Sequence, residues 1–289
     1  MEFYLQLIVN GISIGVIYAL IAIGLSLIFG VLEIVNFAHG EFYMLGAMAS
    51  YFLVSQLHLG YWPSVLVVTI GAGAVGFVLY EGLLATIRGK DFERSILLTL
   101  GVSMVLQNGA IFLWTTTPRM VSTSYSYTNL IFGEVRISLV RLLAMAIACV
   151  AFTALYYVLY RTKFGKAMRA VAQNREAAFI VGIDPRAISR LAVMIGIGLS
   201  GLAGAALAPV YTVHPTMGFA YVFKAFAVVI IGGFGNITGA MVAAILLGVL
   251  ENLIGGFLPL TVVDALAFVA MILVLLFKPE GLFGRGVRV

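Results

Sequence analysis

The sequence predicts an all-α protein, a bundle of helices that crosses a membrane several times. Apolar residues make up 62% of the 289 residues, charged residues make up only 10%, and the mean hydropathy is +1.11. Soluble domains are about 25% charged, and so few charges cannot cover so much apolar surface in water. The apolar residues also form long runs, as helices that cross about 30 Å of hydrocarbon require.

Nine runs are predicted to cross the membrane within one domain that covers residues 1–289. They are 5–30, 42–57, 62–87, 95–115, 137–160, 186–209, 221–235, 237–256 and 260–277. The seventh and eighth are short, and only the turn 232–236 separates them. Broken helices or a re-entrant pair are therefore alternatives there, with eight or ten crossings in all.

The basic residues predict an external N-terminus and a cytoplasmic C-terminus, because Lys and Arg concentrate in cytoplasmic loops. With nine spans, thirteen of the 17 basic residues fall on one side: Arg88, Lys90, Arg94, Arg161, Lys163, Lys166, Arg169, Arg175, Arg186, Arg190, Lys278, Arg285 and Arg288. The other side keeps Arg119, Arg136 and Arg141. The net charge of +5 is spread over short loops, a pattern that favours membrane lipid and not nucleic acid as the partner.

The polar loop 161–186 is predicted to form short helices on the cytoplasmic side. Asn174 is a good N-cap, Glu176 suits the first turn of a helix over about 175–181, and Gly182 is placed to end it. Asp184 then caps the next helix, with Pro185 at its first position. A helix with small and apolar residues and a basic collar can rest on anionic lipid or insert into a groove of a partner protein.

Four stretches resemble one family, the permeases of branched-chain amino-acid ABC importers: Gly24–Gly46, Gly165–Asp184, Phe223–Gly239 and Lys278–Gly284. Within the second, E-A-A-F-I-V-G resembles the start of the loop by which ABC importer permeases dock on their ATPase. The resemblance implies a single permease domain with a coupling loop at 161–186. It also implies contact with the ATPase through Gly165, Arg169, Asn174, Glu176, Ala177, Ala178 and Gly182.

The resemblance further implies the partners and the location. Members of this family work with two ATPase subunits, a second permease and an extracytoplasmic binding protein, in the inner membrane of a bacterium or archaeon. Their substrates include leucine, isoleucine and valine, other amino acids, urea and short amides. The resemblance does not say which of these substrates this chain carries, or whether the second permease is identical or different.

Two groups of polar residues lie where lipid is expected. Glu33, Asn36, His39 and Glu41 fall in the cytoplasmic turn between the first two spans, where they either line a pathway or gate, or satisfy a broken helix. Lys224, Glu251 and Asp264 share an outer depth. We expect Lys224 to pair with one of the two acids and to shape the outer mouth of a pathway, or else to reach the lipid headgroups. Asn236 occupies the inner turn as a further candidate for the pathway.

The sequence predicts no enzyme. It has no G-x-x-x-x-G-K-[ST] motif, so a separate subunit would have to bind ATP. His39 has no second histidine nearby and Cys149 is the single cysteine, so no metal site and no cofactor is expected. The alternative function is a stand-alone secondary transporter of a small polar solute, which should carry ion-coordinating acids at the midplane. A channel should carry rings of like charge or filter carbonyls.

Overall fold

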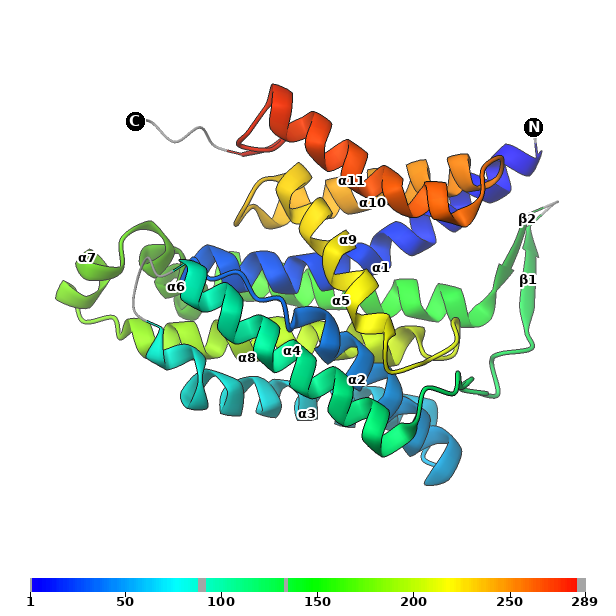
Figure 1. Ribbon diagram of the computed structural model, residues 1–289, viewed down its shortest axis with the longest axis horizontal. Coiled ribbons are helices and arrows are strands. Elements are labelled where there is room, and N and C mark those ends of the chain that lie inside the picture. Colours follow the sequence, from blue (N-terminus) through cyan, green and yellow to red (C-terminus); the bar gives the residue numbers. More distant parts are fainter. Residues whose placement is uncertain (1, 88–91, 133–134, 285–289) are drawn as a thin grey trace.

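The computed structural model describes residues 2–87, 92–132 and 135–284, and nearly all of its regular structure is helical, as predicted (Figure 1). The helices are α1 (Glu2–Leu32), α2 (His39–Tyr51), α3 (Tyr61–Gly82), α4 (Phe92–Trp114), α5 (Leu139–Arg161), α6 (Lys163–Gln173), α7 (Arg175–Ile180), α8 (Pro185–Leu207), α9 (Met217–Gly232), α10 (Ile237–Gly255) and α11 (Leu260–Phe277). A π-helical turn at Phe52–Gln56 extends α2, and a 3₁₀ turn at Leu84–Thr86 follows α3. Strands β1 (Asn129–Phe132) and β2 (Val135–Ser138) form an antiparallel hairpin, with Asn129 opposite Ser138.

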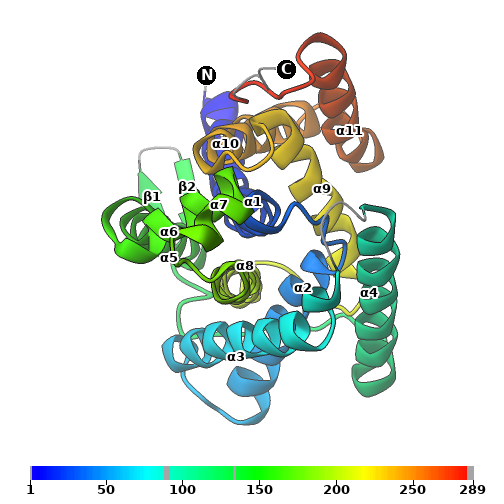
Figure 2. The ribbon, with the colours of Figure 1, turned by 90° about the vertical axis from the view of Figure 1, so that its left-hand side faces the viewer.

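Helices α1 and α8 form the centre of the bundle, and the other long helices surround them (Figure 2). Glycine allows the closest contacts. A Cβ on Gly24 would lie 2.5 Å from the carbonyl oxygen of Gly196, and a Cβ on Gly248 would lie 2.5 Å from the amide of Gly15. The small residues of α1 therefore let α8 and α10 approach to backbone contact, which is how helices pack tightly in lipid.

The molecule has two distinct ends. Helices α6 and α7 occupy one end, and the β1–β2 hairpin occupies the other (Figure 1). The turn between α9 and α10 also reaches the α6–α7 end, because Gly235 packs on Gly30 near the last turn of α1. Gly233 and Gly235 both have positive φ, and the amide of Leu282 donates to the Ile231 carbonyl oxygen, which ties the C-terminal tail to this turn.

Six helices of the described chain are long and apolar enough to cross a membrane: α1, α3, α4, α5, α8 and α10. Helix α9 and most of α11, Val262–Phe277, are apolar but shorter. These helices fit a multi-pass membrane protein. The predicted count of nine also requires the shorter α9 and α11, and α2 with its π-helical extension. The count and the topology remain predictions. Of the basic residues used for orientation, Arg88, Lys90, Arg285 and Arg288 lie outside the described residues.

The connection between α1 and α2 returns into the bundle. Helix α2 begins at His39, whose ring Nε2 lies 3.0 Å from the carbonyl oxygen of Ile21. Ile21 precedes the end of α1 by eleven residues, about 16 Å at 1.5 Å per residue. Residues 33–38 therefore run back into the bundle after α1 ends. The sequence places these residues in the turn between the first two spans, but hydropathy does not report the direction that a short connection takes.

Candidate functional site

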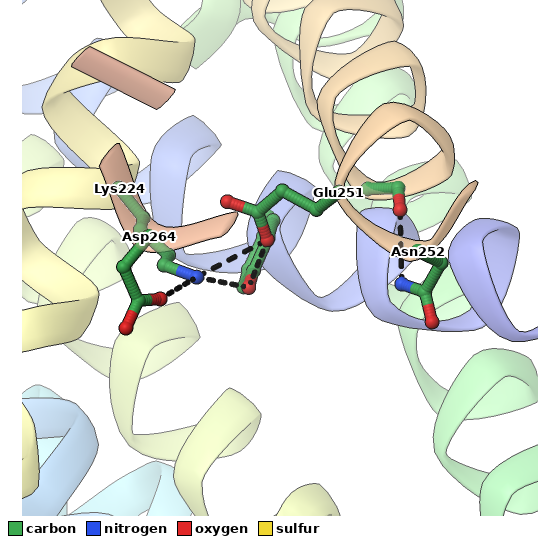
Figure 3. Close-up of polar contacts among 6 residues, drawn as sticks. Lys224, Glu251, Asn252 and Asp264 are labelled. Atoms are coloured by element: carbon green, nitrogen blue, oxygen red, sulfur yellow. Dashed lines mark hydrogen bonds and ion pairs between the residues drawn. The ribbon is translucent and has the colours of Figure 1, made fainter. Parts of the chain in front are cut away.

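A cluster of charged residues joins α9, α10 and α11. Nζ of Lys224 lies 3.1 Å from Oε2 of Glu251 and 3.0 Å from Oδ1 of Asp264 (Figure 3). The predicted pairing of Lys224 is confirmed, and it involves both acids. Neighbouring Asn252 does not take part, since its amide donates to the Gly248 carbonyl oxygen within its own helix.

Tyr18 completes this cluster from α1. Its hydroxyl donates to Oε2 of Glu251 at 2.8 Å and accepts from Lys224 at 3.0 Å. Tyr18 lies near the middle of the 31-residue helix, so the cluster joins the interior of the bundle. The Tyr221 ring packs against the rings of Tyr18 and Tyr43, at centroid distances of 6.3 and 4.3 Å. The charges thus adjoin a group of phenols contributed by three helices.

The cluster has one buried side and one open side. The Glu251 side chain is 4% exposed and the Lys224 side chain 15%, whereas the Asp264 side chain is 68% exposed. Burial of the acid and base together is favourable only when both are hydrogen-bonded. Lys224 is fixed by its buried contact with Glu251, and it therefore holds the exposed Asp264 carboxylate in place at the surface of α11.

The first group of polar residues is split by the fold. Asn36, His39 and Glu41 are fully buried, and Glu33 is exposed at the end of α1 with a φ of 56°. Oδ1 of Asn36 accepts from the amide of Ala38, and Ser103 donates to Oε1 of Glu41 at 3.0 Å. Oε2 of Glu41 has no partner among the described residues.

The carbonyl oxygen of His39 is also satisfied, because it accepts from the hydroxyl of Ser200 at 2.9 Å. These bonds tie the first turn of α2 to α1, α4 and α8. The alternative in which these polar residues satisfy a broken helix therefore has direct contacts in its favour. Their role in a pathway remains a prediction.

Two cavities lie at the α6–α7 end. One of about 540 Å³ is lined by residues that include Asn236, Arg169 and Gln173, and one of about 360 Å³ is lined by residues that include Glu33 and Arg175. Oδ1 of Asn236 accepts from the amide of Gly239, which caps α10, and its Nδ2 donates to the carbonyl oxygen of Phe283. Asn236 thus holds the turn and the tail together beside the larger cavity.

The helix pair α6–α7 forms much as its caps predict. Oδ1 of Asn174 accepts from the amide of Ala177 at 2.9 Å, and Oδ1 of Asp184 accepts from the amide of Arg186 at 2.9 Å. Helix α7 ends at Ile180, one residue earlier than predicted, and Gly182 follows with a φ of 85°. Since the left-handed region favours glycine, Gly182 sets the direction in which the chain leaves α7.

Of the residues expected to contact the ATPase, Gly165 and Ala178 are buried, and Arg169 is partly buried against α5. Ala178 is buried at 3% exposure. A Cβ on Gly165 would lie 2.1 Å from the Leu159 carbonyl oxygen, and Arg169 donates to that oxygen while stacking on Tyr160. These residues hold α6 on the end of α5. The other four expected residues, Asn174, Glu176, Ala177 and Gly182, are exposed. The apolar residues Phe179, Ile180 and Val181 are exposed beside them, at 68, 83 and 74%.

The comparisons with known proteins agree over nearly the whole chain. The profile of the family described as "Branched-chain amino acid transport system / permease component" matches residues 7–275. The chain belongs to this permease family. It is 32% identical to the high-affinity branched-chain amino acid transport system permease protein BraD of Pseudomonas aeruginosa, over 98% of this chain and 96% of the relative. It is 30% identical, with the same coverage, to the permease protein LivH of Escherichia coli K12.

The chain is also similar, at lower identity, to a permease protein of the same transport system with another name. The permease shares 24% identity with LivM of Escherichia coli K12, a second high-affinity branched-chain amino acid transport system permease protein, over 93% of this chain and 68% of the relative. No solved structure matches the chain. The permease is therefore a membrane component of an ABC import system, and its apolar helices suit a multi-pass position in the membrane.

Sequence reasoning did not place Tyr18 in the charged cluster. Tyr18 is a phenol within an apolar run, where a buried hydroxyl needs a polar partner, and that requirement was the available signal. The exposed residues Phe179–Val181 follow the E-A-A letters of the motif, but only the structure of α7 tells which side of the helix faces the solvent.

Proposed function

We propose that this permease is one of two membrane subunits of an ATP-driven importer of branched-chain amino acids in a prokaryotic inner membrane. The observation that carries the proposal is the similarity to BraD and LivH over 98% of the chain. A separate ATPase pair binds and hydrolyses ATP, and an extracytoplasmic binding protein delivers the amino acid. The chain forms one domain over residues 1–289, and its coupling loop at 161–186 lies on the cytoplasmic side.

Uptake measurements test this proposal. The permease is co-produced with its ATPase, second permease and binding protein, and radiolabelled leucine, isoleucine, valine, urea and acetamide are offered to proteoliposomes that enclose ATP. We expect uptake of the three amino acids, and its loss when a non-hydrolysable nucleotide replaces ATP. Uptake by this chain alone that an ionophore abolishes would instead identify a secondary transporter.

Nine crossings with an external N-terminus are the topology we propose. It is supported by the asymmetry of the basic residues and by the positions of the β1–β2 hairpin and α6–α7 at opposite ends (Figure 1). Ser122 and Gln173 are both exposed and lie toward these two ends. In a Cys149→Ala background, an impermeant thiol reagent added to sealed cells should label Ser122→Cys and not Gln173→Cys. Labelling of Gln173→Cys would contradict this topology, because it would place the α6–α7 end outside the cell.

We propose that α7 contacts the ATPase through Phe179, Ile180 and Val181, supported by their exposure at the tip of α7. Ile180→Asp should leave the permease folded and reduce ATPase co-purification and uptake by more than about tenfold, because an unpaired charge in an interface costs about 2–5 kcal/mol. Ala178→Asp is the matched control, since it should lower the thermal stability of the permease itself. Normal ATPase binding by Ile180→Asp contradicts this contact.

A further inference from the structure

The cluster around Lys224 carries more negative than positive charge. An ammonium group has three N–H donors, and Lys224 directs its donors at Tyr18, Glu251 and Asp264. With both acids ionised, two carboxylates face one ammonium group. No other described basic side chain pairs with either acid. The cluster therefore has the charge to accept one more cation.

Asp264 is the member that can meet such a cation. Its Oδ1 is held by Lys224, its side chain is 68% exposed, and no described residue donates to its Oδ2. The rest of α11 is apolar apart from Thr261, and a bare carboxylate is costly against hydrocarbon. The open side of Asp264 is therefore a place for a polar group rather than for lipid chains. Glu251 adds a buried Oε1 without a partner, on the side of Lys224 and Asp264 (Figure 3).

An aromatic surface adjoins this carboxylate. Phe268 lies one helical turn after Asp264, and Phe223 directly precedes Lys224. The Phe223 ring packs against Phe268 at 6.0 Å and against Phe219 at 4.6 Å. Phe219 and Phe268 are 52 and 38% exposed. An accessible acid thus lies next to accessible apolar rings on one face of α9 and α11.

We propose that Asp264 and the Phe219–Phe223–Phe268 surface form a binding site for an apolar amino acid in transit. Oδ2 of Asp264 accepts the α-ammonium group, and the aliphatic side chain packs on the three rings. Lys224, fixed by Tyr18 and Glu251, positions the Asp264 carboxylate. This inference rests on the proposed function and deepens it, because an ammonium group beside an aliphatic side chain is the chemistry that leucine, isoleucine and valine share.

Thiol protection in the complete transporter tests the site. In a Cys149→Ala background, Ala220→Cys puts a small exposed thiol on α9, one turn before Lys224 and beside Phe219. Leucine at about ten times its dissociation constant should slow labelling by a methanethiosulfonate reagent by about tenfold. The keto acid analogue of leucine, which lacks the ammonium group, should not slow labelling. Val269→Cys is the control, because it is exposed on α11 but lies about 140° around the helix from Asp264.

Changes at Asp264, made in the Ala220→Cys protein, test the role of the carboxylate. Asp264→Asn should weaken leucine protection by about tenfold or more, because it removes a charge-assisted hydrogen bond, and Asp264→Glu should restore part of it. Equal protection by the keto acid, or full protection in Asp264→Asn, overturns the proposal. Loss of the second permease from the Asp264→Asn complex also overturns it, since the acid then pairs with a protein partner. Uptake of leucine without protection defeats only this inference, whereas absence of any amino-acid uptake defeats the proposed function.

Discussion

Two buried glutamates of this permease are stabilised in different ways. Glu251 is 4% exposed and has a lysine and a phenol within 3.1 Å of its Oε2. Glu41 is 1% exposed and receives one hydrogen bond, from the hydroxyl of Ser103. Its Oε2 lies over the first turn of α9, at the place where a Cβ on Gly218 would be 2.6 Å away.

The difference separates an ion-paired site from a packing site. Glu41 belongs to the first turn of α2 and lies against the first turn of α9, so the partial positive charges of two helix N-termini surround it. Glu251 instead depends on the charge of Lys224, a long side chain that comes from another helix, α9. Removal of Lys224 should therefore lower the stability of the permease far more than any single change around Glu41 does.

Lys224→Ala should have the largest effect. It leaves Glu251 buried without its counter-ion, and breaking a buried pair in this way costs about 3–5 kcal/mol. We expect a lower yield of folded permease and a lower midpoint of thermal unfolding in detergent. The triple change Lys224→Met, Glu251→Gln and Asp264→Asn should recover much of the loss. Lys163→Ala is the control, because Lys163 is an exposed residue at the start of α6. An unchanged midpoint in Lys224→Ala would remove the distinction between the two glutamates.

The two isosteric changes compare the glutamates directly. Glu251→Gln should cost about 1.5–3 kcal/mol, the range for hydrogen bonds to charged groups, because it weakens the contacts with Lys224 and Tyr18. Glu41→Gln keeps an acceptor for Ser103 and loses no lysine, so we expect about 1 kcal/mol or less. Thermal unfolding of the two variants side by side measures the difference. A larger loss in Glu41→Gln would mean that the helix N-termini bind their carboxylate more strongly than Lys224 binds its own.

Gly218→Ala probes the packing around Glu41. The added Cβ would lie 2.6 Å from Oε2 of Glu41 and 2.7 Å from the carbonyl oxygen of Gly40. Overpacking of this kind costs about 1–3 kcal/mol. Gly101→Ala in α4 is the matched control, because nothing lies within 4 Å of its Cβ position, and it should be neutral or stabilising by helix propensity. Equal unfolding midpoints for the two variants would show that α2 and α9 separate more easily than their glycine contact indicates.

Removal of single hydroxyl groups should also have small effects. Tyr18→Phe takes one hydrogen bond from Glu251 and one from Lys224, and Ser103→Ala takes the bond to Glu41. We expect about 0.5–1.5 kcal/mol in each case. Tyr18→Phe should be additive with Ser103→Ala and non-additive with Glu251→Gln, since only the latter pair shares contacts. Additivity of Tyr18→Phe with Glu251→Gln would place the phenol outside the charged cluster.

Much of the local structure follows from the sequence. The apolar runs predict the long helices. The side chains of Asn174 and Asp184 predict the starts of α7 and α8, and both side chains cap these helices in the structure. A partner for Lys224 is also favoured by the sequence, because a lone charge at that depth is costly, although the structure decides between an acid and the lipid headgroups. Each of these inferences depends on neighbouring residues or on the free energy of transfer into lipid, and both can be read along one chain.

Contacts between distant segments required the tertiary structure. The burial of His39 against Ile21, the inward-facing Ala178 and the reach of Tyr18 to Glu251 join residues that are far apart in sequence or that share a helix with exposed neighbours. Hydropathy gives the depth that a residue prefers, but it does not give the direction of residues 33–38 after α1. The close approach of α8 and α10 to the glycines of α1 determines which space is left inside the bundle, and that space places α2 and the charged cluster.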